Sequence, residues 1–241
     1  MEIQNIMNII VLISANAEWR AIKPLFPNVE IEQSPFGDYF RVSLDTDNCS
    51  LVTFFHGGWG KISAAATTQY VIDRFQPDLL VNLGTCGGFE GRIETGTIIL
   101  VEKTIVYDIV EQMGDPDGAI AEYSTEIDLS WLPGAWLVSI QRGLLVSGDR
   151  DIVVEDIPML VSRFGASAAD WESGAIAWVA NKNRVRCLIL RGVTDLVGSG
   201  GGEAYGNFDL FQQRTNEVMR QLVDLLRDWL ENMNRVGLPG A

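Results

Sequence analysis

The sequence contains few of the residues that most often bind metals or form disulfide bonds. Its only histidine is His56, and its three cysteines (Cys49, Cys86 and Cys187) lack the close spacing of zinc ligands. An odd number of widely separated cysteines also differs from the paired pattern of a disulfide scaffold. We therefore expect neither a metal site nor a disulfide framework, and only one histidine is available for catalysis.

Positive charge is scarce as well. The 241 residues include 18 basic and 32 acidic side chains, which gives a formal net charge of -14. Nucleic acids are bound by clustered lysines and arginines, so this balance argues against a nucleic-acid partner. A nucleoside carries no phosphate and is not excluded by this argument.

No apolar run is long enough to cross a membrane. The N-terminal stretch MEIQNIMNIIVLIS starts acidic rather than basic and lacks a small-residue cleavage pattern, so it predicts a first strand and no signal peptide. Hydrophobic residues make up 47% of the chain, which is enough for a sizeable core in one domain spanning residues 1–241. The expected protein is cytoplasmic and has no membrane partner.

Short apolar runs alternate with helical patterns along the chain. The runs lack clean alternation, which is typical of strands buried on both faces; they cover Ile9–Ser14, Leu51–His56, Leu79–Leu83, Thr97–Val106, Leu144–Ser147 and Cys187–Arg191. Helices are predicted over Ile62–Phe75, about Asp170–Lys182, and about Phe208–Met233 with Asn207 as its N-cap. This order predicts an α/β fold with a largely parallel central sheet. The least regular segment is Asp115–Trp136, and residues 198–202 (GSGGG) predict a flexible loop.

Polar motifs follow several predicted strands, where ligands of open α/β sheets bind. Glu18 lies in the first turn of a helix, residues 84–88 (GTCGG) predict a glycine-rich turn, and Asp195 follows another strand. Each has a structural explanation: an acid complements a helix N-terminus, glycines make tight turns, and an aspartate initiates a turn. Partly desolvated carboxylates that converge have different pKa values, so one donates a proton while another accepts one. That combination suits cleavage of a glycosidic bond.

Residues 168–178 (AADWESGAIAW) are typical of a helix made for burial, yet Glu172 lies near the start of this stretch. An unpaired buried carboxylate is costly, so Glu172 needs a partner or a ligand unless it lies on the helix surface.

Four motifs occur in the order and spacing of the nucleoside phosphorylase/nucleosidase superfamily. They are residues 56–89 (HGGWGKISAAATTQYVIDRFQPDLLVNLGTCGGF), 143–149 (GLLVSGD), 169–179 (ADWESGAIAWV) and 190–196 (LRGVTDL). The chain resembles the 5'-methylthioadenosine/S-adenosylhomocysteine nucleosidases most, from about Ile9 to Leu230. The resemblance implies a single-domain, three-layer α/β/α sandwich with a central mixed, mostly parallel sheet.

The resemblance also implies catalytic roles for three acids. Asp195 matches the aspartate that donates a proton to purine N7, and Glu18 matches the glutamate that activates the attacking water. Glu172 matches the glutamate that accepts hydrogen bonds from the ribose hydroxyls.

Five further positions match residues that bind the substrate in the family. Trp171 stands where a methionine usually packs on the sugar. Thr85 replaces the usual serine of the glycine-rich turn, to which Gly87 also belongs. Asp151 and Ile152 fall where residues contact the base, and Asp151 occupies a position where phenylalanine commonly stacks on adenine.

The resemblance favours hydrolysis over phosphorolysis. Phosphorolysis needs cationic groups for an incoming phosphate, and Asn82 stands where related phosphorylases have an arginine. We therefore expect a purine-nucleoside hydrolase that needs no metal or organic cofactor and forms a homodimer. Two alternatives are a phosphorylase and a nucleoside-binding homologue without activity; the unusual Asp151, Trp171 and Ser173 motivate the second.

For four other residues a structural role has to be weighed against a functional one. His56 is expected to be a structural or surface residue rather than a ligand contact, and Cys86 to be a small buried residue. Trp59, like Trp171, is either a pocket wall or an ordinary core or interface residue. Arg191 is expected to form a structural ion pair.

Overall fold

The structure is a computed structural model that describes residues 7–44, 50–132 and 140–236, so Cys49 lies outside the described residues. The strands are β1 (Met7–Ile13), β2 (Glu32–Gln33), β3 (Asp38–Val42), β4 (Ser50–His56), β5 (Leu79–Phe89), β6 (Ile98–Val106), β7 (Ser124–Glu126), β8 (Gln141–Ser147), β9 (Ala168–Asp170), β10 (Cys187–Gly198) and β11 (Gly201–Gly202). The α-helices are α1 (Asn16–Ile22), α2 (Gly60–Phe75), α3 (Pro116–Glu122), α4 (Ile157–Phe164), α5 (Ser173–Asn183) and α6 (Phe208–Val236). Short 3-10 helices cover Lys23–Leu25 and Val154–Asp156.

Within the described residues, the strands form one mixed sheet in the order β11-β10-β6-β8-β9-β5-β1-β4-β3-β2, with β7 beside β6. Because β10 also pairs with β5, the strands β5, β10, β6, β8 and β9 form a closed ring of pairings. The central strands β4, β1, β5 and β10 are parallel to one another. Antiparallel pairings join β10 to β6, β9 to β5 and the outer strands. Parallel pairings also join β8 to β6 and to β9, so the α/β fold and the mixed sheet are confirmed.

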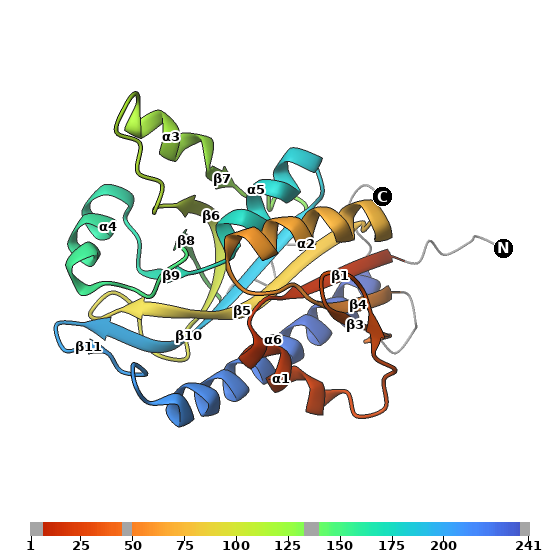
Figure 1. The fold of residues 1–241 in the computed structure, drawn as a ribbon. Coiled ribbons are helices and arrows are strands. Elements are labelled where there is room, and N and C mark those ends of the chain that lie inside the picture. Colours follow the sequence, from red (N-terminus) through yellow and green to blue (C-terminus); the bar gives the residue numbers. More distant parts are fainter. Residues whose placement is uncertain (1–6, 45–49, 133–139, 237–241) are drawn as a thin grey trace.

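Helices cover both faces of the central strands (Figure 1). In β1, Ile9, Val11 and Ile13 pack in the cluster that includes residues of α1 and α6. The intervening Ile10 and Leu12 pack in the cluster that includes residues of α2 and α5. Because successive side chains of a strand point to opposite faces, β1 is buried on both sides, as its unbroken apolar run predicted.

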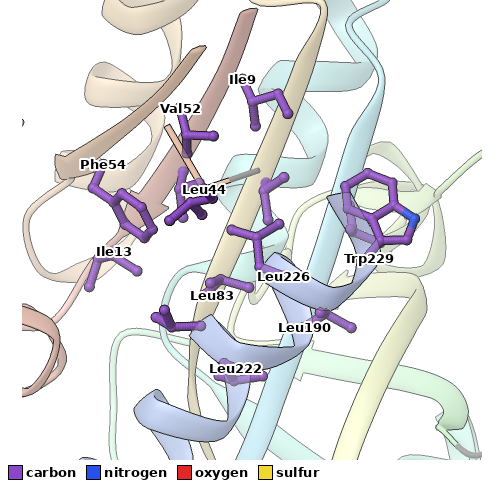
Figure 2. Packing of buried hydrophobic residues seen from close by; sticks show 14 of the residues in the cluster. Ile9, Ile13, Leu44, Val52, Phe54, Leu83, Leu190, Leu222, Leu226 and Trp229 are labelled. Carbon is purple, nitrogen blue, oxygen red and sulfur yellow. The ribbon is translucent and has the colours of Figure 1, made fainter. Parts of the chain in front are cut away.

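The apolar side of α6 anchors this helix to the sheet. Leu222, Leu226 and Trp229 are each at most 1% exposed, and their spacing of three and four residues places them on one side of the helix. Figure 2 shows these side chains facing the strands that carry Leu83 and Leu190. Each buried leucine stabilises the fold by about 1.5–3 kcal/mol relative to an exposed one. The main-chain N–H of Leu210 donates to Asn207 Oδ1 at 3.2 Å, which confirms the predicted N-cap.

The glycine-rich segment and Asp195 lie within strands, so their prediction as a turn and a post-strand residue was wrong. β5 and β10 pair without interruption from Leu80 opposite Cys187 to Phe89 opposite Val197, apart from one bulge before Asp195. Glycine is needed here for close packing. A Cβ on Gly88, for example, would lie 2.6 Å from Ile93 Cγ2.

The stretch at residues 168–178 is also only partly helical. Ala168–Asp170 form β9, α5 begins at Ser173, and Glu172 is its N-cap residue. The helix cannot start earlier because Asp170 accepts a hydrogen bond from the main-chain N–H of Ser173, at 3.0 Å, while Ala169 pairs with Gly87.

Two segments expected to be irregular contain regular structure. α3 and β7 lie in the segment 115–136, of which residues 133–136 are outside the described ranges. The GSGGG segment includes β11, which pairs antiparallel with the end of β10. In the described part of the chain, no helix combines the length and the apolar character needed to cross a bilayer.

Candidate active site

A cavity of about 530 Å³ opens where β1 and β8 end and beside the second halves of β5 and β10. All eight predicted site residues line it: Glu18, Thr85, Gly87, Asp151, Ile152, Trp171, Glu172 and Asp195. They come from segments far apart in the chain, which the sheet brings together at one edge.

Other residues of the cavity wall escaped the sequence analysis. They are chiefly Arg150, Asp170, Tyr205, Phe208 and Phe211. Phe211 lies near the start of α6, and Tyr205 lies in the loop after β11, where no pattern singles it out. Only the three-dimensional path of that loop brings these aromatic side chains to the cavity.

Glu18 lies in the first turn of α1, contacts β5 and is 4% exposed. Its Oε1 accepts hydrogen bonds from the main-chain N–H of Thr85, at 2.6 Å, and from the Thr85 hydroxyl, at 3.0 Å. Its Oε2 accepts a hydrogen bond from the main-chain N–H of Ala15, at 3.1 Å. Three donors therefore fix the orientation of this carboxylate at the cavity wall.

A buried arginine lies on the other side of Gly84. Arg191 is 1% exposed, donates to Asp170 Oδ2 at 2.8 Å and to Asn82 Oδ1 at 2.6 Å, and thereby confirms the predicted ion pair. A Cβ on Gly84 would lie 2.3 Å from Arg191 Nη1 and 2.8 Å from Glu18 Oε1. Only glycine at this position lets the arginine and the glutamate approach each other.

Asp170 orders the start of α5 and hence Glu172. Besides Arg191, its carboxylate accepts hydrogen bonds from the Ser147 hydroxyl, the Ser173 hydroxyl and the Ser173 main-chain N–H. Ser173 is unusual for the family that the chain resembles, and this network gives it a structural role.

Glu172 is 7% exposed and its Oε1 accepts one hydrogen bond, from the main-chain N–H of Gly60 at 3.0 Å. Burial, together with the charges of Asp170 and Glu18, raises the pKa of Glu172 from 4.5 to about 8. This buried carboxyl is therefore the kind of group that gains from hydrogen-bond donors on a ligand.

The raised pKa of Glu172 predicts a pH-dependent stability. Between about pH 4.5 and about pH 8 the unfolded chain has lost this proton while the folded protein keeps it, so stability falls as pH rises. We expect Glu172→Gln to remove up to about 1.4 kcal/mol of this loss per pH unit across that window. The measurement is urea unfolding from pH 4.5 to 8.5, with Glu217→Gln, an exposed glutamate of α6, as control. Parallel stability curves for wild type and Glu172→Gln would contradict the buried, protonated state.

Asp195 follows the bulge in β10 and lies opposite Gly87 of β5. It is 7% exposed, and burial raises the pKa of Asp195 above its usual value. The Thr194 hydroxyl, which donates to Asp195 Oδ1 at 3.0 Å, and the charge of Arg214 partly offset this shift in pKa. A carboxyl that retains its proton more readily than usual is suited to act as a general acid.

Two tryptophans form an aromatic wall of the cavity. The rings of Trp59 and Trp171 stack with centroids 5.0 Å apart and planes 24° apart, although Trp59 is 63% exposed. Both line the cavity, so the pocket-wall explanation is the correct one for these residues.

His56 and Cys86 are structural in the way that we expected. The His56 ring stacks on Trp19 with centroids 5.3 Å apart, outside the cavity wall, and desolvation lowers the pKa of His56. Cys86 borders the cavity but is 4% exposed, and burial raises the pKa of its thiol, which makes it a poor nucleophile.

The cavity wall is strongly acidic. It carries the carboxylates of Glu18, Asp151, Asp170, Glu172 and Asp195, and its one basic side chain among the described residues is Arg150. Arg150 Nη2 lies 3.3 Å from Asp156 Oδ2, so the two side chains form an ion pair. In the described ranges, no group of three histidine, cysteine or acidic side chains is arranged to hold a metal ion.

The structure is that of an α/β protein in which a mixed sheet flanked by helices carries an acid-lined cavity at the ends of its strands. Residues 9–228 match the family described as the phosphorylase superfamily, and the chain belongs to this family, which confirms the predicted resemblance.

Individual relatives are nucleosidases. The chain is 29% identical over 178 residues to a 5'-methylthioadenosine/S-adenosylhomocysteine nucleosidase of Thermotoga maritima, covering 73% of this chain and 79% of the relative. It is 27% identical over 206 residues to the nucleosidase of the same description from Anoxybacillus flavithermus, covering 78% and 84%. The crystal structure of the Campylobacter jejuni 5'-methylthioadenosine/S-adenosyl homocysteine nucleosidase shares the fold, with a TM-score of 0.77, 18% identity, and coverage of 94% of this chain and 99% of that one.

Proposed function

We propose that this protein is an N-glycosidase that hydrolyses the bond between base and sugar in a purine nucleoside. Its relatives are named for two members of this class, 5'-methylthioadenosine and S-adenosylhomocysteine. The observation that carries the proposal is the convergence of three buried carboxyls, from α1, from the N-cap of α5 and from β10, on one cavity.

Asp195 is the proposed general acid. Burial raises the pKa of Asp195, so this carboxyl holds a proton more readily than usual and is suited to donate it to N7 of the base as the glycosidic bond breaks. The electron pair of that bond leaves with the base, and the protonated ring is a better leaving group than an anionic one.

Glu18 is the proposed base. Three donors hold its carboxylate in place beside the cavity, where it can accept a proton from a water molecule that attacks the anomeric carbon. The base then leaves with the proton from Asp195, and the sugar gains the hydroxyl of the water.

Glu172 is the proposed partner of the ribose hydroxyls, with Trp171 beside it on the sugar. Hydroxyl donors on the ligand favour the charged carboxylate, which burial otherwise disfavours. Thr85 and Gly87 on one side and Asp151 and Ile152 on the other are the proposed contacts of the remaining substrate.

Water, rather than phosphate, is the nucleophile that this cavity favours. The wall offers an anion no free cationic group, because its only basic lining residue among the described ones is close to Asp156. Asn82 cannot replace a phosphate-binding arginine because its amide is fully buried and bonded to Leu12 O and Arg191.

The test is base release from purine nucleosides with and without inorganic phosphate. We expect equal rates in both buffers and free ribose or its 5'-substituted form as the product. Ribose 1-phosphate, formed only when phosphate is present, would identify a phosphorylase instead.

Gly84 is predicted to be essential for the site although it contacts no substrate. In Gly84→Ala the new Cβ would push Arg191 and Glu18 apart, so we expect a loss of kcat of at least about tenfold and a destabilisation of about 1–3 kcal/mol. The comparison is Gly114→Ala, where the added Cβ meets nothing within 4 Å. Equal turnover of the two variants would show that the close approach of Arg191 and Glu18 is irrelevant.

We also propose that the chain is one three-layer domain that works as a cytoplasmic homodimer. The homodimer is supported by two exposed apolar side chains. Trp59 is 63% exposed beside the cavity, and Ile62 is 85% exposed near the start of α2. Light scattering should give the mass of two 26.6 kDa chains, and a mass of one chain would exclude the dimer.

A further inference from the structure

Asp151 is an unpaired carboxylate on the wall of the cavity. It follows β8, is exposed, and makes no hydrogen bond or ion pair with the described residues. The neighbouring Arg150 does not neutralise it, because that guanidinium lies 3.3 Å from Asp156 instead. A carboxylate in this position can only accept hydrogen bonds, so it is suited to a ligand that offers N–H or O–H donors.

Asp151 lies at the end of the cavity that holds the proposed proton donor. The adjacent Ile152 approaches Gly87, where an added Cβ would lie 2.6 Å from Ile152 Cδ1, and Gly87 is the residue of β5 opposite Asp195. The charge of Asp151 also contributes to the raised pKa of Asp195, whereas the acids that raise the pKa of Glu172 are Asp170 and Glu18. Asp151 therefore accompanies the proposed proton donor, and not the proposed partner of the sugar.

The main chain beside Asp151 is already engaged. The carbonyl oxygen of Ile152 accepts a hydrogen bond from the Tyr205 hydroxyl at 3.0 Å, and both residues line the cavity. The carboxylate of Asp151 is thus an acceptor that remains available at this end.

Purine bases differ in what they present to such an acceptor. Guanine offers two adjacent donors, N1–H and the 2-amino group, which match the two oxygens of a carboxylate. Hypoxanthine offers N1–H alone. Adenine presents the lone pair of N1 beside its amino group, and this lone pair repels a carboxylate.

We propose that Asp151 makes the site selective for a 6-oxopurine nucleoside, with guanine favoured over hypoxanthine and both favoured over adenine. The selectivity rests on the proposed N-glycosidase activity and specifies its base. Asp151 receives N1–H and the 2-amino group, while Asp195 reaches N7 on the other side of the ring.

The test compares guanosine, inosine and adenosine, which share the same ribose and differ only in the base. We expect wild-type kcat/KM to be about 10- to 100-fold higher for guanosine than for adenosine, as a charge-assisted pair of hydrogen bonds would give. In Asp151→Asn the ratio should fall by a similar factor, because a carboxamide offers one donor and one acceptor and so suits adenine. Glu155→Gln, an exposed acid on the same segment, should keep the wild-type ratio.

A wild-type preference for adenosine, or an unchanged ratio in Asp151→Asn, would overturn the proposal. Calorimetry with the Asp195→Asn variant separates this result from a failure of the proposed function. If no nucleoside is cleaved but guanosine still binds more tightly than adenosine, and this preference is lost in the additional Asp151→Asn background, the base selectivity stands and the hydrolase assignment does not. Equal binding of all three nucleosides would remove the selectivity as well.

Discussion

Asp195→Asn is expected to lower kcat for nucleoside cleavage by about 10²–10⁴-fold. The amide has nearly the same shape and can still accept the hydrogen bond from the Thr194 hydroxyl, but it has no acidic proton to transfer to the leaving base. Because the amide matches the carboxyl in shape and keeps this hydrogen bond, the free energy of unfolding should change by less than about 1 kcal/mol.

The measurement is single-turnover base release, followed by chromatography, together with thermal unfolding. Asp73→Asn, an exposed aspartate on α2, provides the control for an arbitrary loss of one acid. Undiminished base release by a folded Asp195→Asn variant would remove this residue from the mechanism.

Glu18→Gln should produce a loss of similar size, about 10²–10⁴-fold, because a neutral amide cannot take a proton from water. This variant should also be destabilised, unlike Asp195→Asn. An amide oxygen can accept the two bonds from Thr85, but the amide nitrogen would then face the main-chain N–H of Ala15, a clash of two donors. Leaving that N–H unsatisfied costs about 1–3 kcal/mol.

Turnover and urea unfolding of Glu18→Gln separate these two effects. Glu217→Gln, on the exposed side of α6, is the matched control and should behave as wild type in both assays. A Glu18→Gln variant that is destabilised but fully active would assign Glu18 to structure alone.

The sequence predicted the central strands well because strands buried on both faces appear as unbroken apolar runs. β1 and β4 are apolar on both faces, and the amphipathic pattern of α6 with Asn207 as its cap appears in the structure. The predicted α/β fold followed from these elements, whereas the mixed sheet was implied by the resemblance.

The glycine-rich segment was misinterpreted because glycine has more than one structural use. Residues 84–88 are favourable for a turn, but here they allow β5 to pass close to Ile93, Arg191 and Ile152. Only the packing of distant side chains distinguishes these cases, and this packing is not visible in a local pattern.

The boundary at Glu172 was missed for a related reason. The Ser147 hydroxyl and the Arg191 guanidinium are 23 and 21 residues from Asp170 in the chain, yet their bonds to Asp170 help to fix where α5 begins. Glu18, Glu172, Asp195 and the glycine-rich segment were singled out from the sequence pattern. The resemblance assigned their roles and added Trp171, Asp151 and Ile152, whereas Tyr205 and Phe208 depend on the path of a loop. Local periodicity carries no information about that path.

The most direct test of the account is whether the wild-type protein cleaves a purine nucleoside in phosphate-free buffer. Methylthioadenosine, adenosine, inosine and guanosine would each be incubated with the enzyme and analysed for free base and free sugar. We predict equal amounts of both products from at least one nucleoside, at a rate that Asp195→Asn lowers by about 10²-fold or more. Recovery of every nucleoside intact after hours, with binding detected by calorimetry, would contradict the account and identify a binding protein.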